Sequence, residues 1–362
     1  MKLRGKSILL ISPQKWEGQF VSKHHYAREL AFKGNQVFFL GPPSKKGRVE
    51  IKPTNFENVF VISHSFWFSR KIRFHFRDLF DILVKFHVKS LIKKIGSIDL
   101  VWCFEPNLYK NLAWFGSETK IYHPVDYVEE KTQIQVGISA DIIFSVAYNI
   151  LDQFHDIETP SFFINHGLSN DFIQDCKVKQ CAKISFAYIG NLMIRGLDRK
   201  SISEIILTHP EIEFDFYGSY PVHSDDSFID FLNVQPNCHL KGIKTTAELA
   251  QLLKSYSGFL MCYNPEMELN NGSNSHKILE YLSFGKVIIA NKVLHYEQHR
   301  DLIQMSTQSN NSDYVELFQE TVLNINKYNS EELFEKRRAL AYENTYSKQI
   351  DRIEKHLNEV LA

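Results

Sequence analysis

Short apolar runs alternate with helix-like patterns through the first half of the chain. Ile8–Ser12 and Val37–Leu40 predict buried strands, and Ser22–Lys33 between them predicts a helix. This order makes a βαβ unit, which implies a parallel sheet with right-handed crossovers. A long helical segment, Phe74–Ile95, lies further along. Other apolar runs predict strands at Val59–Ile62, Leu100–Phe104, Lys120–His123, Ile142–Ser145 and Phe162–Ile164.

The same alternation restarts after a polar stretch without periodicity, Ser169–Ala182, which we interpret as a linker. Predicted strands follow at Lys183–Ile189, Glu213–Tyr217, Gly258–Cys262 and Val287–Ala290, with helices at Ser201–Thr208, Ala247–Ser255 and Ser275–Phe284. Two successive α/β halves of similar size indicate two Rossmann-like domains. We expect the boundary between Ser169 and Lys183.

The end of the chain predicts one more helix, around Tyr346–Leu361. Its apolar residues recur at steps of three and four and make one apolar face: Tyr346, Ile350, Ile353, Leu357 and Val360. This face lies well past the last predicted strand.

Composition limits the classes of function. Lys plus Arg and Asp plus Glu number 42 each, so no chain-wide charge favours a nucleic-acid partner. The five cysteines are scattered without a CxxC spacing, which argues against a zinc site and for a reducing compartment. The apolar run Ile8–Ile11 is too short for a signal peptide or a membrane span. We therefore expect a cytoplasmic protein.

One segment departs from this charge balance. Residues 66–95 hold eight cations, Arg70, Lys71, Arg73, Arg77, Lys85, Lys89, Lys93 and Lys94, against Asp78 and Asp81. Phe76, Leu79, Phe80, Leu83 and Phe86 fall at helical spacing in the same segment. Two interpretations stay open. Residues 74–95 are either a basic amphipathic helix on the inner face of the membrane, or an ordinary core helix with a solvated basic back.

Ligands of open parallel sheets gather at the carboxyl ends of the strands. In the second half these positions hold Gly190-Asn191, Gly218-Ser219 and Asn264-Pro265. A polar loop, residues 270–275, then leads into the helix predicted at Ser275–Phe284. Its backbone N–H groups and the helix dipole would face a phosphate, with charge from Lys277 and a hydroxyl from Ser275. A solvated lysine and plain turn glycines are the structural alternatives.

Three segments resemble one enzyme family. Ser275–Ile288 resembles the donor-binding helix of GT-B glycosyltransferases, above all the retaining, family-four-like bacterial enzymes of cell-surface polysaccharide synthesis. Ala187–Asp198 resembles the first strand of that family's donor domain. Ile164–Leu168 resembles its Asn-Gly-containing segment at the interdomain crossing.

The resemblance implies a complete architecture. Residues 1–170 would form an acceptor-binding Rossmann-like domain and residues 171–340 a nucleotide-sugar-binding one, facing each other across a cleft. Residues 341–362 would return as a helix to the first domain. The implied reaction moves a sugar from a nucleotide-diphosphate sugar to a glycan or lipid-linked acceptor. It would retain configuration and need neither a metal nor another cofactor.

The resemblance also places the donor. It puts the diphosphate at Gly190, Arg195, Ser275, His276 and Lys277 and the ribose at Glu280; Asn191, Gly218 and Asn274 complete the candidate set. Asn191 stands where the family has an arginine, and Gly272 where it has a second glutamate. These departures leave two alternatives open: a catalytically silent nucleotide-sugar-binding or partner-binding protein, and a nucleotide-sugar epimerase.

In the first half, His123 and Asp126 follow a predicted strand. They are candidates to polarise an acceptor hydroxyl or to orient the donor, because imidazole and carboxylate groups transfer protons near neutral pH. The structural alternative is a pair of ordinary hydrogen-bonding residues at a strand end.

Overall fold

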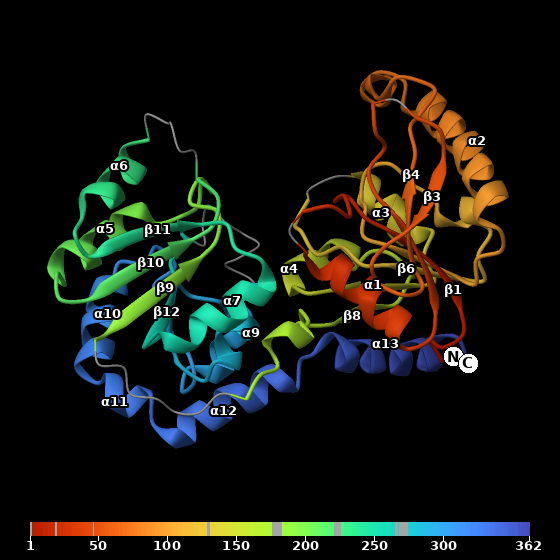
Figure 1. Ribbon diagram of the computed structural model, residues 1–362. Coiled ribbons are helices and arrows are strands. Elements are labelled where there is room, and N and C mark those ends of the chain that lie inside the picture. The colour runs from red at the N-terminus through yellow and green to blue at the C-terminus, as the bar shows by residue number, and fades with distance from the viewer. Residues whose placement is uncertain are drawn as a thin grey trace. The chain divides into compact units, whose positions relative to one another are not determined.

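The computed structural model describes residues 2–18, 20–45, 47–128, 131–175, 183–220, 226–264, 267 and 274–362. The chain divides into two compact units (Figure 1). The first unit comprises Met1–Asn165 and Tyr346–Ala362, and the second comprises His166–Thr345. The break after Asn165 lies slightly before the expected linker.

An eight-stranded sheet forms the centre of the first unit, in the order β3-β4-β2-β1-β5-β6-β7-β8. Its strands are β1 Ser7–Ile11, β2 Gln36–Leu40, β3 Glu50–Pro53, β4 Val59–Ser63, β5 Leu100–Cys103, β6 Thr119–Tyr122, β7 Ile142–Ser145 and β8 Ser161–Phe163. β3 pairs antiparallel with β4, and the other described pairs are parallel. The helices are α1 Ser22–Phe32, α2 Arg77–Ile95, α3 Lys131–Ile138, α4 Tyr148–Leu151 and α13 Tyr346–Val360.

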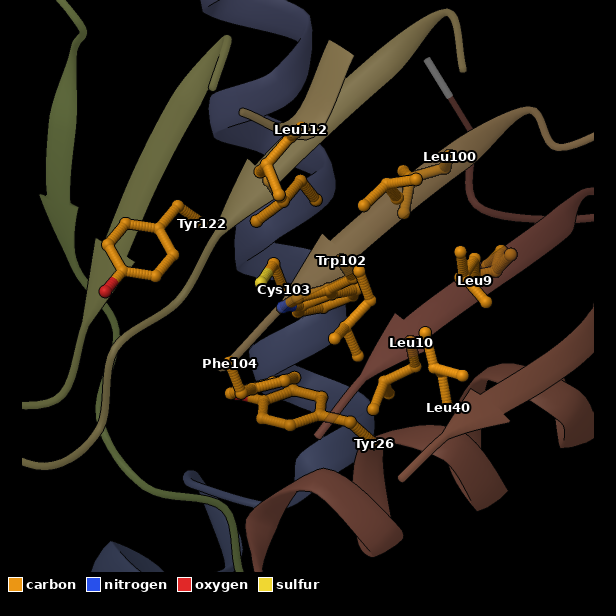
Figure 2. Close-up of a cluster of buried hydrophobic side chains, with 14 of the residues drawn as sticks. Leu9, Leu10, Tyr26, Leu40, Leu100, Trp102, Cys103, Phe104, Leu112 and Tyr122 are labelled. Atoms are coloured by element: carbon orange, nitrogen blue, oxygen red, sulfur yellow. The ribbon is translucent and has the colours of Figure 1, made fainter. Parts of the chain in front are cut away.

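The central strands are apolar on both faces because helices cover both sides of a parallel sheet. Every residue of β5 is buried. Figure 2 shows this core, in which Trp102 of β5 lies against Tyr26 of α1, with ring centroids 5.0 Å apart. The short apolar runs of the sequence are therefore core strands.

The last helix belongs to the first unit. Tyr346, Ile350, Ile353 and Leu357 of α13 are buried in that unit's core. The Tyr346 ring lies 5.0 Å from the ring of Tyr26 in α1. In the middle of α13, Glu354 Oε1 accepts a hydrogen bond from the Leu3 backbone N–H at 2.8 Å. The chain thus leaves the second unit and completes the first, as expected.

The second unit contains a six-stranded parallel sheet in the order β11-β10-β9-β12-β13-β14. Its strands are β9 Ser185–Ile189, β10 Glu213–Tyr217, β11 Cys238–Gly242, β12 Gly258–Met261, β13 Val287–Ala290 and β14 Gln304–Met305. Its described helices are α5 Arg199–Thr208, α6 Ser227–Val234, α7 Thr246–Leu252, α9 His276–Ser283, α10 Tyr314–Leu323, α11 Ile325–Tyr328 and α12 Glu331–Tyr342. The predicted fold class, two Rossmann-like α/β sheets with a returning C-terminal helix, is confirmed.

The structure corrects some element boundaries. The helical segment predicted at Phe74–Ile95 is divided: a 3-10 helix, η1 Arg70–Phe74, ends before α2 begins at Arg77. The edge strand β3 was not predicted, because it is mostly exposed and ends in a proline. In the part of the chain that the structure describes, no helix is long and apolar enough to cross a membrane.

Two buried histidines tie α2 to the sheet. His64 Nδ1 lies 2.9 Å from Nε2 of His87, which is in α2, and His64 Nε2 lies 3.1 Å from the Gly41 carbonyl oxygen. Burial lowers the pKa of His64 to about 4, and the Gly41 carbonyl opposes this shift. Burial, and then the neighbouring His64, lowers the pKa of His87 to about 4.

This pair predicts a loss of stability in mild acid. Unfolded histidines titrate near pH 6.5, so between about pH 6.5 and 4 the unfolded chain binds more protons than the folded one. The two neutral histidines therefore contribute to the free energy of unfolding above about pH 6.5. This contribution is lost as the pH falls towards 4, and it amounts to about 2 kcal/mol or more for the pair. Calorimetry across this range should show a shallower fall in Tm for H64N/H87Q than for the parent. Replacing the exposed His155 by Asn should leave the slope unchanged; an unchanged slope in H64N/H87Q would contradict the assignment.

Candidate functional site

Two glycines meet where β9 and β10 end. A Cβ atom on Gly218 would lie 1.8 Å from the Gly190 carbonyl oxygen, and one on Gly190 would lie 2.6 Å from the Tyr188 hydroxyl. The Gly218 φ of +148° also disfavours a side chain. Glycine is therefore required at position 218, where the two backbones touch at the carboxyl edge of the sheet.

The loop after β9 carries the next two predicted residues. Asn191 is exposed, and its Oδ1 accepts a hydrogen bond from the Met193 backbone N–H at 2.9 Å. This contact closes a turn, so the Asn191 amide is used within its own loop. Arg195 is exposed, and no described residue forms a hydrogen bond or ion pair with it. The guanidinium is therefore available to an external anion.

The start of α9 holds a buried hydroxyl. Ser275 occupies the N-cap position, but its side chain makes no capping hydrogen bond. The residue is 1% exposed, and its Oγ has no partner among the described residues. A buried hydroxyl without a partner is costly. Its place beside the first N–H groups of a helix is suited to an anionic ligand that would accept a hydrogen bond from it.

Lys277 lies in the first turn of the same helix and reaches towards the sheet. Its Nζ donates to the Tyr263 hydroxyl at 2.7 Å and lies 5.0 Å from the centroid of that ring. Tyr263 follows β12, and its hydroxyl is 3.1 Å from the Tyr188 hydroxyl in β9. Tyr263 therefore connects the Gly190 edge with α9, a role that sequence reasoning missed. Its position just after a predicted strand was the available signal.

Glu280 lies one turn further along α9. Its Oε1 is 4.0 Å from His276 Nε2, and its side chain is 22% exposed. Burial raises the pKa of Glu280 to about 7, and the Lys277 ammonium opposes the shift. The structure thus brings His276, Lys277 and Glu280 together on one helix. The His166 ring, from the Ile164–Leu168 segment, lies 5.9 Å from the His276 ring.

Asn274 precedes Ser275 and is buried. Gly272, where the family has a second glutamate, lies outside the described residues. Within the described ranges, no three His, Cys, Asp or Glu side chains gather as a metal site would require.

In the first unit, His123 and Asp126 both follow β6. His123 is fully buried; its Nδ1 accepts a hydrogen bond from Trp102 Nε1 at 3.3 Å, and its ring stacks on Phe104 at 4.9 Å. The Asp126 side chain is 58% exposed, and its Oδ2 lies 3.8 Å from Lys23 Nζ. The structure therefore encloses the imidazole and presents the carboxylate to solvent.

Lys23 was missed by the sequence reasoning. It lies in the first turn of α1 and is 3% exposed. Burial lowers the pKa of its ammonium group, and the nearby Asp126 opposes the shift. A lysine in the helix that follows the first strand was the available signal, because that helix begins at the same sheet edge as the β6 loop.

Two Rossmann-like α/β units, the first of them completed by the C-terminal helix, are the arrangement of the GT-B fold. No protein-family profile and no curated protein sequence matches the chain. Solved structures do match it over nearly its whole length. Sucrose-phosphate synthase from Thermosynechococcus elongatus has 12% identity and a TM-score of 0.73, covering 98% of this chain and 99% of that one.

Two further structures agree. Anabaena HepE in complex with UDP-glucose has 11% identity and a TM-score of 0.70, covering 98% of this chain and 100% of its own. The lipopolysaccharide outer core galactosyltransferase WaaB has 16% identity and a TM-score of 0.65, with 98% of each chain covered. At these identities the likeness establishes the fold.

The contact between Gly190 and Gly218 predicts that alanine at position 218 lowers the free energy of unfolding more than alanine at another glycine with a positive φ. G218A should cost about 3 kcal/mol or more, because its Cβ meets backbone that must shift, in addition to the strain of a positive φ. Gly242 is a matched control in the same sheet, since it has a φ of +70° and a Cβ added there would have nothing within 4 Å. G242A should cost about 1 kcal/mol. Urea unfolding of both variants checks the difference; equal losses would mean that backbone strain, not collision, dominates.

Proposed function

We propose that this chain is a glycosyltransferase that binds a nucleotide-diphosphate sugar at the carboxyl edge of the second sheet. The observation that carries the proposal is the buried Ser275 hydroxyl at the start of α9, beside Lys277. Among the residues that the structure describes, this hydroxyl has no hydrogen-bond partner. A diphosphate oxygen would accept a hydrogen bond from this hydroxyl and from the helix N–H groups.

The charges around this point suit two phosphates. Lys277 and the exposed Arg195 each supply one cation, from α9 and from the loop after β9. We place Gly190, Asn191 and Gly218 along the diphosphate, since the two glycines leave the backbone there without side chains. Asn274 and His276 would lie on either side of Ser275. A charge-assisted hydrogen bond is stronger than a neutral one, so these cations should dominate affinity.

Glu280 is assigned to the ribose. As a carboxylate it accepts hydrogen bonds from two neighbouring hydroxyls, which matches a ribose edge. Its half-buried position keeps competing water away, at the cost of a raised pKa.

The fold relatives suggest the donor to test first. HepE was solved with UDP-glucose, and WaaB is described as a galactosyltransferase. We therefore propose a UDP-hexose donor and a glycan or lipid-linked acceptor.

The finer features of the proposed reaction come from the sequence. The three motif segments support retention of configuration, independence of metal and membership of the family-four-like group. In the first unit we propose Asp126, with Lys23 beside it, as the group that meets the acceptor hydroxyl. His123 would act from inside the core by fixing the β6 loop.

A catalytically silent nucleotide-sugar-binding protein is the second candidate. It is favoured by Asn191, which is neutral where the family carries an arginine and whose amide is used within its own turn. Incubation with UDP-glucose discriminates the two, because slow hydrolysis or transfer requires a working catalytic site whereas binding does not.

The donor site predicts selective losses of affinity. Lys277→Ala and Arg195→Ala should each weaken UDP binding by about 1–3 kcal/mol, the usual contribution of a hydrogen bond to a charged group. Ser275→Ala should weaken it by about 1 kcal/mol. Isothermal titration with UDP and UDP-glucose measures these losses. Replacing Lys327, an exposed lysine of the same unit, by alanine should change nothing. Parent-like binding by both K277A and R195A would place the site elsewhere.

Glu280 predicts a pH dependence of donor binding. The carboxylate accepts the ribose hydrogen bonds, so affinity for UDP-glucose should fall as the pH decreases through about 7 and Glu280 takes up a proton. UDP-glucose keeps a constant charge over this range. E280Q should bind more weakly at pH 8 and lose most of the dependence. Repeating the titration in H276N removes the imidazole of the same helix. A parent-like pH profile in E280Q would exclude Glu280 from the ribose.

A further inference from the structure

The first unit exposes a row of large apolar side chains on and just before α2. We call Trp67, Phe74, Phe76, Leu79, Ile82 and Phe86 the apolar ridge; their exposed fractions run from 48% to 69%. Figure 1 shows α2, in orange, along the side of this unit next to β3 and β4. Six large apolar side chains are thus exposed within twenty positions of the chain, a density that marks an interaction surface.

α2 has two apolar faces, and one of them packs into the core of the first unit. Phe80, Val84, Val88 and Leu91 are fully buried. Leu79, Ile82 and Phe86 recur at steps of three and four on the opposite, solvent side. These three residues therefore form a second apolar stripe on α2. Of the five apolar positions at helical spacing in the sequence, only Phe80 is fully buried, and Leu83 is partly buried.

Cations surround this stripe. Of the eight in residues 66–95, Arg70, Lys71, Lys85, Lys89, Lys93 and Lys94 are exposed. Asp81, one of the two acids, is 3% exposed and is paired with Arg77 at 3.1 Å and Lys110 at 2.5 Å. The outward charge is therefore strongly positive, although the chain as a whole has none.

We propose that the apolar ridge docks this protein on an anionic lipid bilayer, with α2 lying in the membrane interface. A helix with Trp, Phe and Leu on one side and Lys or Arg around them binds such a surface. Protein interfaces, by contrast, are depleted in lysine. A second copy of this chain would bring the same positive charge to a two-fold contact, which would repel. An anionic leaflet is the partner whose charge complements the ridge.

The side chains are arranged for shallow insertion. The Arg73 guanidinium lies 4.6 Å from the Phe74 ring, and Lys89 Nζ lies 5.7 Å from the Phe86 ring. Each pair places a cation beside a ring, so that the ring can enter the acyl boundary while the charge stays among the headgroups. Trp67, 69% exposed, carries the amphipathic ring that favours this depth.

The docking proposal does not rest on the proposed function. The ridge belongs to the first unit and the donor site to the second, so vesicle binding is measured with no nucleotide sugar present. Loss of donor binding would leave it standing, and loss of vesicle binding would leave the donor site standing.

The test uses the full chain and large vesicles of either pure phosphatidylcholine or a phosphatidylcholine–phosphatidylglycerol mixture. The parent should sediment with the anionic vesicles and not with the neutral ones. Raising sodium chloride from about 0.1 M to about 1 M shortens the screening length from about 10 Å to about 3 Å and should weaken the binding strongly. K85E/K89E should lose about tenfold or more, since each basic residue adds attraction near the leaflet. K327E/K355E, with two exposed lysines elsewhere, should bind like the parent.

A second measurement separates insertion from surface attraction. Trp16 and Trp102 are buried and Trp114 is half-buried, so Trp67 is the tryptophan whose emission should shift to the blue on binding. Brominated lipid should quench it, and W67F should lack both changes. L79S/I82S/F86S should lose the quenching and about tenfold or more in affinity, as expected when buried apolar area is removed, whereas Phe32→Ser, at a position 89% exposed on α1, should not. Sedimentation with neither vesicle, equal sedimentation with both, or no quenching of Trp67 would each overturn the proposal.

Discussion

Parallel pairing is the constraint on which the candidate donor site depends. Because β9, β10 and β12 run in the same direction, their carboxyl ends share one edge, and Gly190, Gly218 and Tyr263 meet there. The meeting is tight enough that the Gly218 Cα faces the Gly190 carbonyl with no room for a side chain. The parallel pairing of these strands therefore brings both the bare glycine backbone and the tyrosine hydroxyls to this edge.

The electrostatics of α9 follow from where that edge places the helix. Its first turn points Lys277 at Tyr263, whose hydroxyl accepts a hydrogen bond from the Lys277 Nζ. Ser275 is buried at the helix start, and none of the residues described in the structure forms a hydrogen bond with its hydroxyl. Glu280 has a raised pKa because burial outweighs the nearby lysine. The buried Ser275 hydroxyl and the largely buried Glu280 carboxylate each cost stability. A ligand with phosphate and ribose groups would form hydrogen bonds with both of them.

The sequence was sufficient for the layers of the fold and for the helix that carries the site. Continuous apolar runs identify strands buried on both faces, and the late apolar stripe of Tyr346–Val360 identifies a separate packing helix. Short or exposed strands escaped, because β3, β11 and β14 present little apolar sequence. Side-chain pairings across the sheet, such as Tyr188 with Tyr263, depend on register and cannot be obtained from spacing. Whether Phe76 or Phe80 faces the core was equally beyond periodicity, since α2 has two apolar stripes.

The exposed apolar stripe of α2 has to be considered together with the charge balance of the whole chain. With 42 cations and 42 anions, excess positive charge around α2 requires excess negative charge elsewhere on the molecule. A neutral protein of this kind feels little net pull towards an anionic surface at long range, but its charge separation responds to the field within a Debye length. Near an anionic leaflet, the field would therefore turn the apolar ridge towards the surface before contact is made. Electrostatic attraction would set the orientation of the protein on the membrane. The inserted phenylalanine and leucine side chains would set how long it stays bound, as expected of a peripheral protein that binds the surface reversibly.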